Sequence, residues 1–401
     1  MGNIVIVGAG QAGASLAQKL RVLGHEDAIT LIGEEPVPPY ERPPLSKGYL
    51  LGKQARERLF LRPEEFYASK DISLRLGHSV DAIDAAAKRV HIGGEALSYD
   101  QLALVTGSTP LRLPKDIGGD LSGVFTVRTL ADIDLMRERF VAGAKVLVVG
   151  GGYIGLEAAA VSAKLGVNVT LVELADRILC RVAAKETADV IREAHVSAGV
   201  DLREGVGLER LIGDASVTGA VLTDGTEMAV DFVIVGIGIR PTTDLAEAAG
   251  ITCENGVEVN EMGQTSVPNI WAAGDCTSFP YKKGRLRLES VQNAIDQAEA
   301  VAANILGASA PYLPYPWFWS DQYDLKLQIA GLNTGYDRVL VRQGETGVSH
   351  WYYQGDTFLA VDAINAPRDY MVGKRLLEMW LGAPDDVVED PAADLKALLK
   401  Q

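Results

Sequence analysis

The sequence predicts an α/β fold with two Rossmann-like dinucleotide-binding domains and an α+β C-terminal domain. Two stretches, beginning at Asn3 and at Lys145, share one order: a short β-branched run, a glycine-rich turn, a helical segment and a second β-branched run. This order is typical of a βαβ unit. After about Trp317 the pattern changes to two strands joined at Gly355-Asp356 and a helical, partly charged tail, which predicts a third domain.

The first glycine-rich turn, GAGQAG, places Gly8, Gly10 and Gly13 at the spacing of a dinucleotide-binding fingerprint. In such a turn the first glycine permits the tight bend, the second lets the backbone approach a pyrophosphate, and the third lets the helix pack closely on the sheet. The helix N-terminus then favours the phosphate charge. Glu34 ends the second strand about 20 residues later, where an acid accepts hydrogen bonds from a ribose.

The second turn, GGGYIG, has Gly150, Gly152 and Gly155 at the same spacing, and Glu173 ends its second strand. A carboxylate there binds a ribose diol and repels a 2′-phosphate, which favours NADH over NADPH. Arg177 is a counter-signal, because a nearby arginine can bind that phosphate. One such turn alone can bind nothing, but two with strand, helix and acid in place predict two dinucleotides and electron transfer between them.

The charge and composition of the 401-residue chain exclude several classes of function. Its formal net charge of −15 argues against nucleic acid and anionic membranes as general partners. The three cysteines show no close pairing and the five histidines have no metal-ligand spacing, so we expect no disulfide framework and no metal site. No secretory signal is apparent before the first strand, and a cytoplasmic location is expected.

With both turns in view, the chain resembles the two-dinucleotide-binding flavoproteins, the fold group of glutathione reductase. In that group a late strand ending in Gly-Asp returns to the flavin nucleotide, and here NIWAAGDCT carries Gly274-Asp275. The resemblance implies FAD on the first turn and NAD on the second. The expected domains are a discontinuous FAD-binding domain, residues 1–112 and 243–318, an NAD-binding domain, residues 113–242, and a C-terminal domain, residues 319–401.

The stretch PPYERPPLSKGYL, residues 38–50, follows the first βαβ unit. At this place disulfide reductases of the fold group carry a redox cysteine pair, and related NADH oxidases carry a single cysteine. This stretch has no cysteine but contains Arg42 and Lys47. Its prolines stiffen the backbone, so Lys47 can be held as a fixed cation against a phosphate or the flavin edge. The alternative is a surface turn with solvated charges.

A more specific resemblance is to the NADH-dependent ferredoxin reductases of oxygenase systems, of the putidaredoxin-reductase and aromatic-ring dioxygenase-reductase type. The matching motifs are PPLSK, VRTLAD, VGGGYIGLE, VGIGIRP, GDC, LESVQNAIDQA and WFWSDQY. The resemblance implies that FAD passes electrons from NADH one at a time to a [2Fe-2S] ferredoxin that feeds an oxygenase. The alternatives are an NADH oxidase or peroxidase, and a flavin-binding interaction protein of the apoptosis-inducing-factor kind.

Carried over position by position, the resemblance implies two sets of site residues, which add to the glycines of the two turns. The FAD set is Gly8, Gly10, Ala12, Gly13, Glu34, Arg42, Lys47, Val80, Arg128, Asp275 and Val291. The NADH set is Gly150, Gly152, Ile154, Gly155, Glu157, Glu173, Gly236, Ile237 and Gly238. Without the resemblance, Val80 and Val291 would be interpreted as core packing.

Three side chains are assigned to catalysis. Lys47 and Glu157 are predicted to form an ion pair near the flavin N5 edge, where the lysine offsets negative charge on reduced flavin. Trp319 is interpreted either as an aromatic cover for the nicotinamide or the electron exit, or as packing between domains.

A local basic patch follows the Gly-Asp motif. It consists of Lys282, Lys283, Arg285 and Arg287 in an otherwise acidic chain. An acidic [2Fe-2S] ferredoxin is expected to dock there, and the alternative is a hairpin loop with solvated charges. We expect the protein to be a monomer or a weak dimer.

Overall fold

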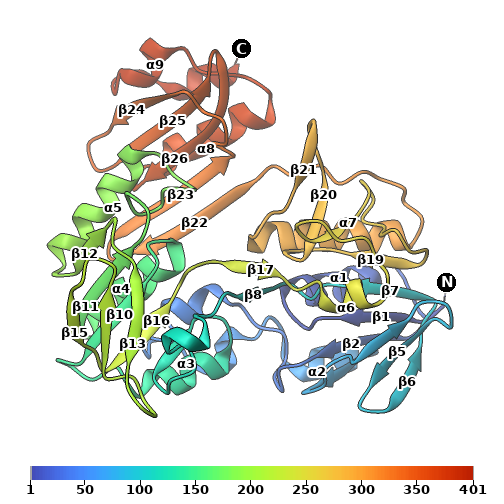
Figure 1. Cartoon of the computed structure of the whole chain (residues 1–401). Helices are drawn as coiled ribbons and strands as arrows, with labels where there is room; N and C mark the ends of the chain where they lie inside the picture. Colours follow the sequence, from blue (N-terminus) through green and yellow to red (C-terminus); the bar gives the residue numbers. More distant parts are fainter. Residues whose placement is uncertain (1, 401) are drawn as a thin grey trace. The chain divides into compact units, whose positions relative to one another are not determined.

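The computed structural model describes residues 2–400, which divide into two compact units, each visible in Figure 1. Unit 1 comprises the described residues up to Arg42, then Ala55–Thr109 and Ile239–Pro314. Unit 2 comprises Pro43–Gln54, Pro110–Gly238 and the described residues from Tyr315 onwards. Within residues 2–400, no helix has the length and apolar character that a membrane crossing requires.

Unit 1 is built around a parallel sheet. Its elements are β1 (Ile4–Val7), α1 (Gln11–Val22), β2 (Ile29–Gly33), η2 (Arg56–Leu59), α2 (Glu64–Ser69), β3 (Ile72–Leu76), β4 (Ala82–Asp84), β5 (Arg89–Ile92), β6 (Glu95–Ser98), β7 (Gln101–Leu104), β8 (Ser108–Pro110, at the unit boundary), β17 (Ile239–Pro241), α6 (Asp244–Ala248), β18 (Val257–Glu258), β19 (Ile270–Ala272), β20 (Thr277–Tyr281), β21 (Gly284–Leu286) and α7 (Val291–Ile305). The sheet has the strand order β19-β7-β1-β2-β3.

The sequence of β1, IVIV, explains its central place in that sheet. All four residues are buried, because a parallel strand has both faces covered and therefore consists of a continuous apolar run. Helices α1 and α7 pack against each other, and Figure 1 shows them on the same side of the sheet. Their buried side chains share a hydrophobic core with those of β1 and β2. The opposite face of the sheet is covered by the β4–β6 hairpins, α6 and β20.

Unit 2 contains the second βαβ unit and the C-terminal sheet. Its elements are η1 (Pro43–Ser46), η3 (Lys115–Ile117), β9 (Val124–Thr126), α3 (Leu130–Arg137), β10 (Lys145–Val149), α4 (Tyr153–Lys164), β11 (Asn168–Glu173), α5 (Lys185–Ser197), β12 (Asp201–Glu204), β13 (Leu208–Ile212), β14 (Gly219–Leu222), β15 (Glu227–Ala229), β16 (Phe232–Val235), β22 (Trp317–Gln322), β23 (Leu325–Gly331), β24 (Arg338–Gln343), β25 (Val348–Gln354), β26 (Thr357–Ile364), α8 (Pro367–Glu378), α9 (Asp385–Glu389) and η4 (Leu395–Lys400).

The two main sheets of unit 2 differ in character. The sheet β12-β11-β10-β16-β9 is parallel, whereas the C-terminal sheet β22-β23-β26-β25-β24 is antiparallel. Helix α8 covers one face of the C-terminal sheet, and the other face meets α4 and α5. The turn predicted at Gly355-Asp356 joins β25 to β26. The predicted α/β fold with an α+β C-terminal part is confirmed, and the exact domain boundaries stay a prediction.

Candidate functional site

The first glycine turn connects β1 to α1 in unit 1. Gly8 has φ +119°, and a Cβ on it would lie 2.2 Å from the carbonyl oxygen of Val105. A Cβ on Gly13 would lie 2.0 Å from the carbonyl oxygen of Gly8. A Cβ on Gly10, by contrast, would have no heavy atom within 4 Å. The fold itself requires glycine at Gly8 and Gly13, while the open space at Gly10 fits a pyrophosphate that approaches the backbone closely.

The second glycine turn repeats this construction in unit 2, between β10 and α4. A Cβ on Gly150 would lie 2.4 Å from the Gly236 carbonyl oxygen, and one on Gly155 would lie 2.1 Å from the Gly150 carbonyl oxygen. A Cβ on Gly152 would again have no neighbour within 4 Å. Ile154, at the start of α4, leaves 43% of its surface exposed. Predicted Gly236, Ile237 and Gly238 directly follow β16, which pairs with β10, and a Cβ on Gly150 would meet the backbone of Gly236 and Ile237.

The two polar residues that bear on nucleotide choice have defined partners. Glu173 ends β11 and accepts hydrogen bonds from the backbone N–H groups of Gly151, at 2.6 Å, and Ala175, at 2.8 Å. Arg177 donates to the backbone carbonyls of three residues in the following loop, Ile178, Cys180 and Ala183. Because its guanidinium is bonded to its own loop, Arg177 is less available to bind the 2′-phosphate of NADPH, and the preference for NADH is strengthened.

Several members of the FAD set lie at the carboxyl ends of the strands of unit 1. Glu34 is exposed directly after β2. Asp275 follows Gly274, and its Oδ2 accepts a 3.0 Å hydrogen bond from the Ser108 hydroxyl. In open α/β sheets ligands bind outside these strand ends, so this placement fits a bound dinucleotide.

The remaining FAD-set residues of unit 1 have more ordinary surroundings. Ala12 is buried in α1, and its Cβ would lie 3.2 Å from a Cβ built on Gly274. Val291 is the first residue of α7. Val80 is half-buried against the core on the other face of the sheet. The geometry is compatible with backbone or packing contacts to a nucleotide, which remain predictions for these residues.

Arg42 is held by neighbouring side chains in unit 1. Its guanidinium forms an ion pair with Glu35, at 2.7 Å, and a 2.9 Å hydrogen bond with the Tyr40 hydroxyl. Sequence reasoning missed Glu35, although it stands next to Glu34 at the end of the same strand. Part of the charge of Arg42 is therefore balanced within the protein.

Lys47 and Glu157 form an ion pair within unit 2. The Lys47 ammonium lies 2.7 Å from Glu157 Oε2, and the Glu157 side chain is only 3% exposed. The Ser46 hydroxyl donates to the same oxygen, and the Ser320 hydroxyl donates to Oε1, each at 2.7 Å. A buried carboxylate is tolerated where donors satisfy both oxygens, as they do here. The predicted ion pair is confirmed, and its position beside a flavin stays a prediction.

The other assigned residues of unit 2 lie at the edges of their elements. Arg128 directly precedes Thr129, the residue that caps helix α3. Trp319 is half-buried on β22, with its ring centroid 5.5 Å from that of Trp317 and 6.3 Å from that of Phe318. Trp319 therefore takes part in aromatic packing, and both of its predicted roles remain predictions.

Comparison with known proteins now identifies the family. Residues 2–298 match the pyridine nucleotide-disulphide oxidoreductase family, and residues 317–399 match the reductase C-terminal family. The chain belongs to the pyridine nucleotide-disulphide oxidoreductases. This membership confirms the predicted class of enzyme, an oxidoreductase.

Within this family the chain has relatives over its whole length. It is 44% identical to a ferredoxin–NAD(P)(+) reductase of Sphingomonas sp., over 94% of this chain and 92% of that one. It is 41% identical to putidaredoxin reductase of Pseudomonas putida, over 99% and 96%. The reductase in the crystal structure of a covalent putidaredoxin reductase–putidaredoxin complex superposes with a TM-score of 0.96 at 40% identity, covering 100% of this chain and 98% of that one. The predicted resemblance is confirmed.

The basic patch lies on the β20–β21 hairpin of unit 1. Lys282 and Lys283 are exposed at its turn. Arg285 donates to the Ser278 backbone and hydroxyl, and Arg287 forms an ion pair with Glu289. Arg285 therefore joins β21 to β20, and Arg287 is paired with an acid just beyond the hairpin, whereas Lys282 and Lys283 present their charges at the exposed turn.

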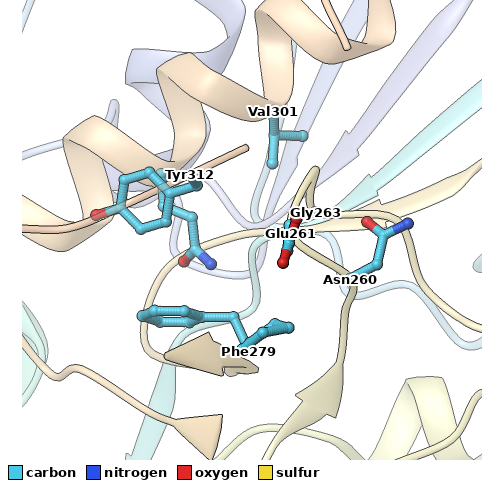
Figure 2. Close-up of a pocket in the computed structure, with 8 residues that line it drawn as sticks. Asn260, Glu261, Gly263, Phe279, Val301 and Tyr312 are labelled. Atoms are coloured by element: carbon cyan, nitrogen blue, oxygen red, sulfur yellow. The ribbon is translucent and has the colours of Figure 1, made fainter. Parts of the chain in front are cut away.

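A hollow elsewhere in unit 1 has no part in the candidate site. Figure 2 shows it between α7, which contributes Val301, and the loop of Asn260, Glu261 and Gly263. The rings of Tyr312 and Phe279, with centroids 5.6 Å apart, pack along it. None of its lining residues belongs to the FAD set.

Proposed function

We propose that this chain is an FAD-dependent reductase that passes electrons from NADH one at a time to a [2Fe-2S] ferredoxin, which feeds an oxygenase. The observation that carries the proposal is the pair of equivalent glycine turns, each closed at its first and third glycines and open at the second. The cofactors are FAD and NADH. When bound, flavin links a two-electron donor to a one-electron acceptor, which is the chemistry that the full-length relatives named as reductases support.

The residues of this chain would bind and orient the two nucleotides. The turns at Gly10 and Gly152 offer backbone N–H groups and helix N-termini to the two pyrophosphates. Glu173 offers its carboxylate to the NADH ribose, and Asp275 offers its own at the strand ends of unit 1. Lys47, held by Glu157, would present the positive end of this ion pair to reduced flavin.

Two sequence features favour this function over its alternatives. Residues 38–50 lack the cysteine expected of an NADH oxidase or peroxidase of this fold group. The net charge of −15 opposes the nucleic-acid binding expected of an apoptosis-inducing-factor-like protein. The proposal includes a monomer or weak dimer in the cytoplasm, with no membrane partner, and the three free cysteines fit a reducing compartment.

Replacing Lys47 by methionine tests the catalytic part of the proposal. We expect K47M to bind flavin but to be reduced by NADH about tenfold more slowly, because the loss of a charge-assisted interaction typically costs 1.5–3 kcal/mol. Stopped-flow absorbance of the flavin measures this rate. Lys53→Met is the matched control, because Lys53 is an exposed lysine of the same Pro43–Gln54 stretch of unit 2. If K47M kept both the rate and the flavin potential of the parent, Lys47 would have no role in the reaction.

Charge reversal at the β20–β21 hairpin tests the docking of ferredoxin. We expect K282E/K283E to lower the second-order rate of ferredoxin reduction about tenfold at low ionic strength, since complementary charge mainly accelerates association. Added salt should reduce the parent rate and narrow the difference. Arg285 is left unchanged because it bonds to the neighbouring strand of the hairpin, and Arg287 because its charge is paired with Glu289. Lys88→Glu is an exposed control in unit 1. Equal rates and a flat salt profile would place the docking surface elsewhere.

A further inference from the structure

A continuous chain of hydrogen bonds runs within unit 2 from Glu157 to helix α5. Glu157 Oε1 is 2.7 Å from the Ser320 hydroxyl, which is 3.2 Å from Gln322 Nε2. Gln322 Oε1 is 2.8 Å from His195 Nε2, and His195 Nδ1 is 3.0 Å from the Tyr323 hydroxyl. These hydrogen bonds therefore link β22 and α5 to Glu157 of α4, which is a member of the ion pair described above.

The chemistry of each group fixes the direction of these bonds. The carboxylate of Glu157 only accepts, so Ser320 donates its single proton there and accepts from the Gln322 amide. The amide oxygen of Gln322 also only accepts, so His195 must carry its proton on Nε2. Burial lowers the pKa of His195, an effect that the bond to Gln322 opposes, so the ring is neutral at neutral pH and its Nδ1 accepts from Tyr323. Every donor thus points toward Glu157.

The side chains that form this hydrogen-bond network occupy buried positions, where apolar side chains would otherwise pack. Ser320, Gln322 and His195 are 1%, 3% and 0% exposed. Ser320 and Gln322 lie on one face of β22, because side chains two residues apart share a face. Buried polar groups are costly unless each is satisfied, and linked hydrogen bonds strengthen one another. A fully satisfied chain that ends on a carboxylate is therefore suited to holding that carboxylate in one orientation.

We propose that Ser320, Gln322 and His195 are positioning residues for the Lys47–Glu157 ion pair. This inference rests on the proposed function and assigns to it residues beyond the ion pair. The terminal carboxylate torsion of glutamate is broad, so a carboxylate held at one oxygen can rotate. Ser320 fixes Oε1, and Oε2 is then directed to Ser46 and Lys47. The hydrogen-bond network thereby fixes the position of the Lys47 ammonium group relative to reduced flavin.

The test compares variants that remove or retain a single hydroxyl. We expect S320A to slow flavin reduction by NADH about tenfold and to shift the flavin midpoint potential, with less than about a twofold change in the dissociation constant of NADH. S320T keeps the hydroxyl and should restore both values. Asp321→Ala, an exposed neighbour on the same strand, should leave them unchanged. Gln322→Leu removes the next link and tests the chain independently of Ser320.

A second measurement does not depend on turnover. The nitrogen-15 NMR shifts of the five histidines should include one neutral ring protonated at Nε2, and Q322L should shift that resonance toward a mixture of tautomers. If S320A and Q322L bound flavin and matched the parent in rate, potential and histidine spectrum, the positioning role would be wrong while the proposed function stood. A parent protein without bound flavin would overturn both.

Discussion

Gly10→Ala is expected to give a folded protein without flavin, whereas Gly152→Ala should keep its flavin and lose affinity for NADH. Both glycines have backbone angles that alanine adopts readily, and a Cβ at either position meets no atom of the protein. The added methyl group would instead occupy the space in which a pyrophosphate approaches the turn. We expect at least about a hundredfold loss of affinity in each case, equivalent to roughly 3 kcal/mol.

The two variants control each other, because each should lose one nucleotide and keep the other. Visible flavin absorbance of the purified protein and titration with NADH measure the two affinities. Gly382→Ala, an exposed glycine with only ordinary contacts, should change neither. Loss of both nucleotides in one variant, with normal thermal unfolding, would contradict the separate assignment of the two turns.

The second large effect concerns the pH dependence of stability. Asp362 and His350 are opposite each other on β26 and β25, and Thr187 of α5 lies 2.8 Å from both side chains. Burial raises the pKa of Asp362 to about 6, although hydrogen bonds from Tyr352 and Thr187 lower it. Burial lowers the pKa of His350 to about 4, against the opposing charge of Glu186.

These two shifts act on stability in opposite directions. The raised pKa of Asp362 contributes stability that is complete below its ordinary pKa of 3.8 and is lost as the pH rises through 6. The lowered pKa of His350 contributes stability that is complete above 6.5 and is lost as the pH falls through 4. Each contribution is about 3 kcal/mol, so in the parent protein they largely cancel between pH 4 and 6.5.

Variants that remove one of the two groups should show a pH dependence of stability that the parent protein lacks. Relative to the parent, D362N should lose about 3 kcal/mol of stability as the pH falls from 6 to 4, and H350N should gain about as much from 6.5 to 4. Thermal unfolding of the flavin-bound protein across this range measures both. Asp356→Asn, exposed at the turn between the same two strands, is the control. Curves for D362N and H350N that ran parallel to the parent curve would refute the opposing contributions.

Sequence alone predicted the parts of the site that are encoded locally. Each glycine turn is specified by a short run of residues, because Gly8 and Gly13 must avoid backbone atoms only a few residues away or on a neighbouring strand. The ion pair of Lys47 and Glu157 was also predicted, although its members are far apart in the chain, because each belongs to a motif of the fold group.

The sequence could not predict contacts that depend on how distant elements pack. The Ser320 hydroxyl reaches Glu157 only because β22 packs beside α4. No local pattern in WFWSDQY predicts this hydrogen bond. In the basic patch, by contrast, the residues are close in sequence, but the sequence does not show which of their charges are paired. The four cations of the patch lie within residues 282–287, yet Arg287 is paired with Glu289 and Arg285 is bonded to the Ser278 backbone, whereas the two lysines lie at the exposed turn of the hairpin.

Electron counting in the absence of oxygen tests the central claim most directly. One equivalent of NADH should bleach the flavin of the purified protein, and oxidised [2Fe-2S] ferredoxin added afterwards should restore the flavin spectrum as two ferredoxins are reduced per NADH. The account predicts this ratio of two because NADH donates two electrons and each ferredoxin accepts one. Flavin that stayed reduced with ferredoxin, and was reoxidised only when oxygen was admitted, would contradict it.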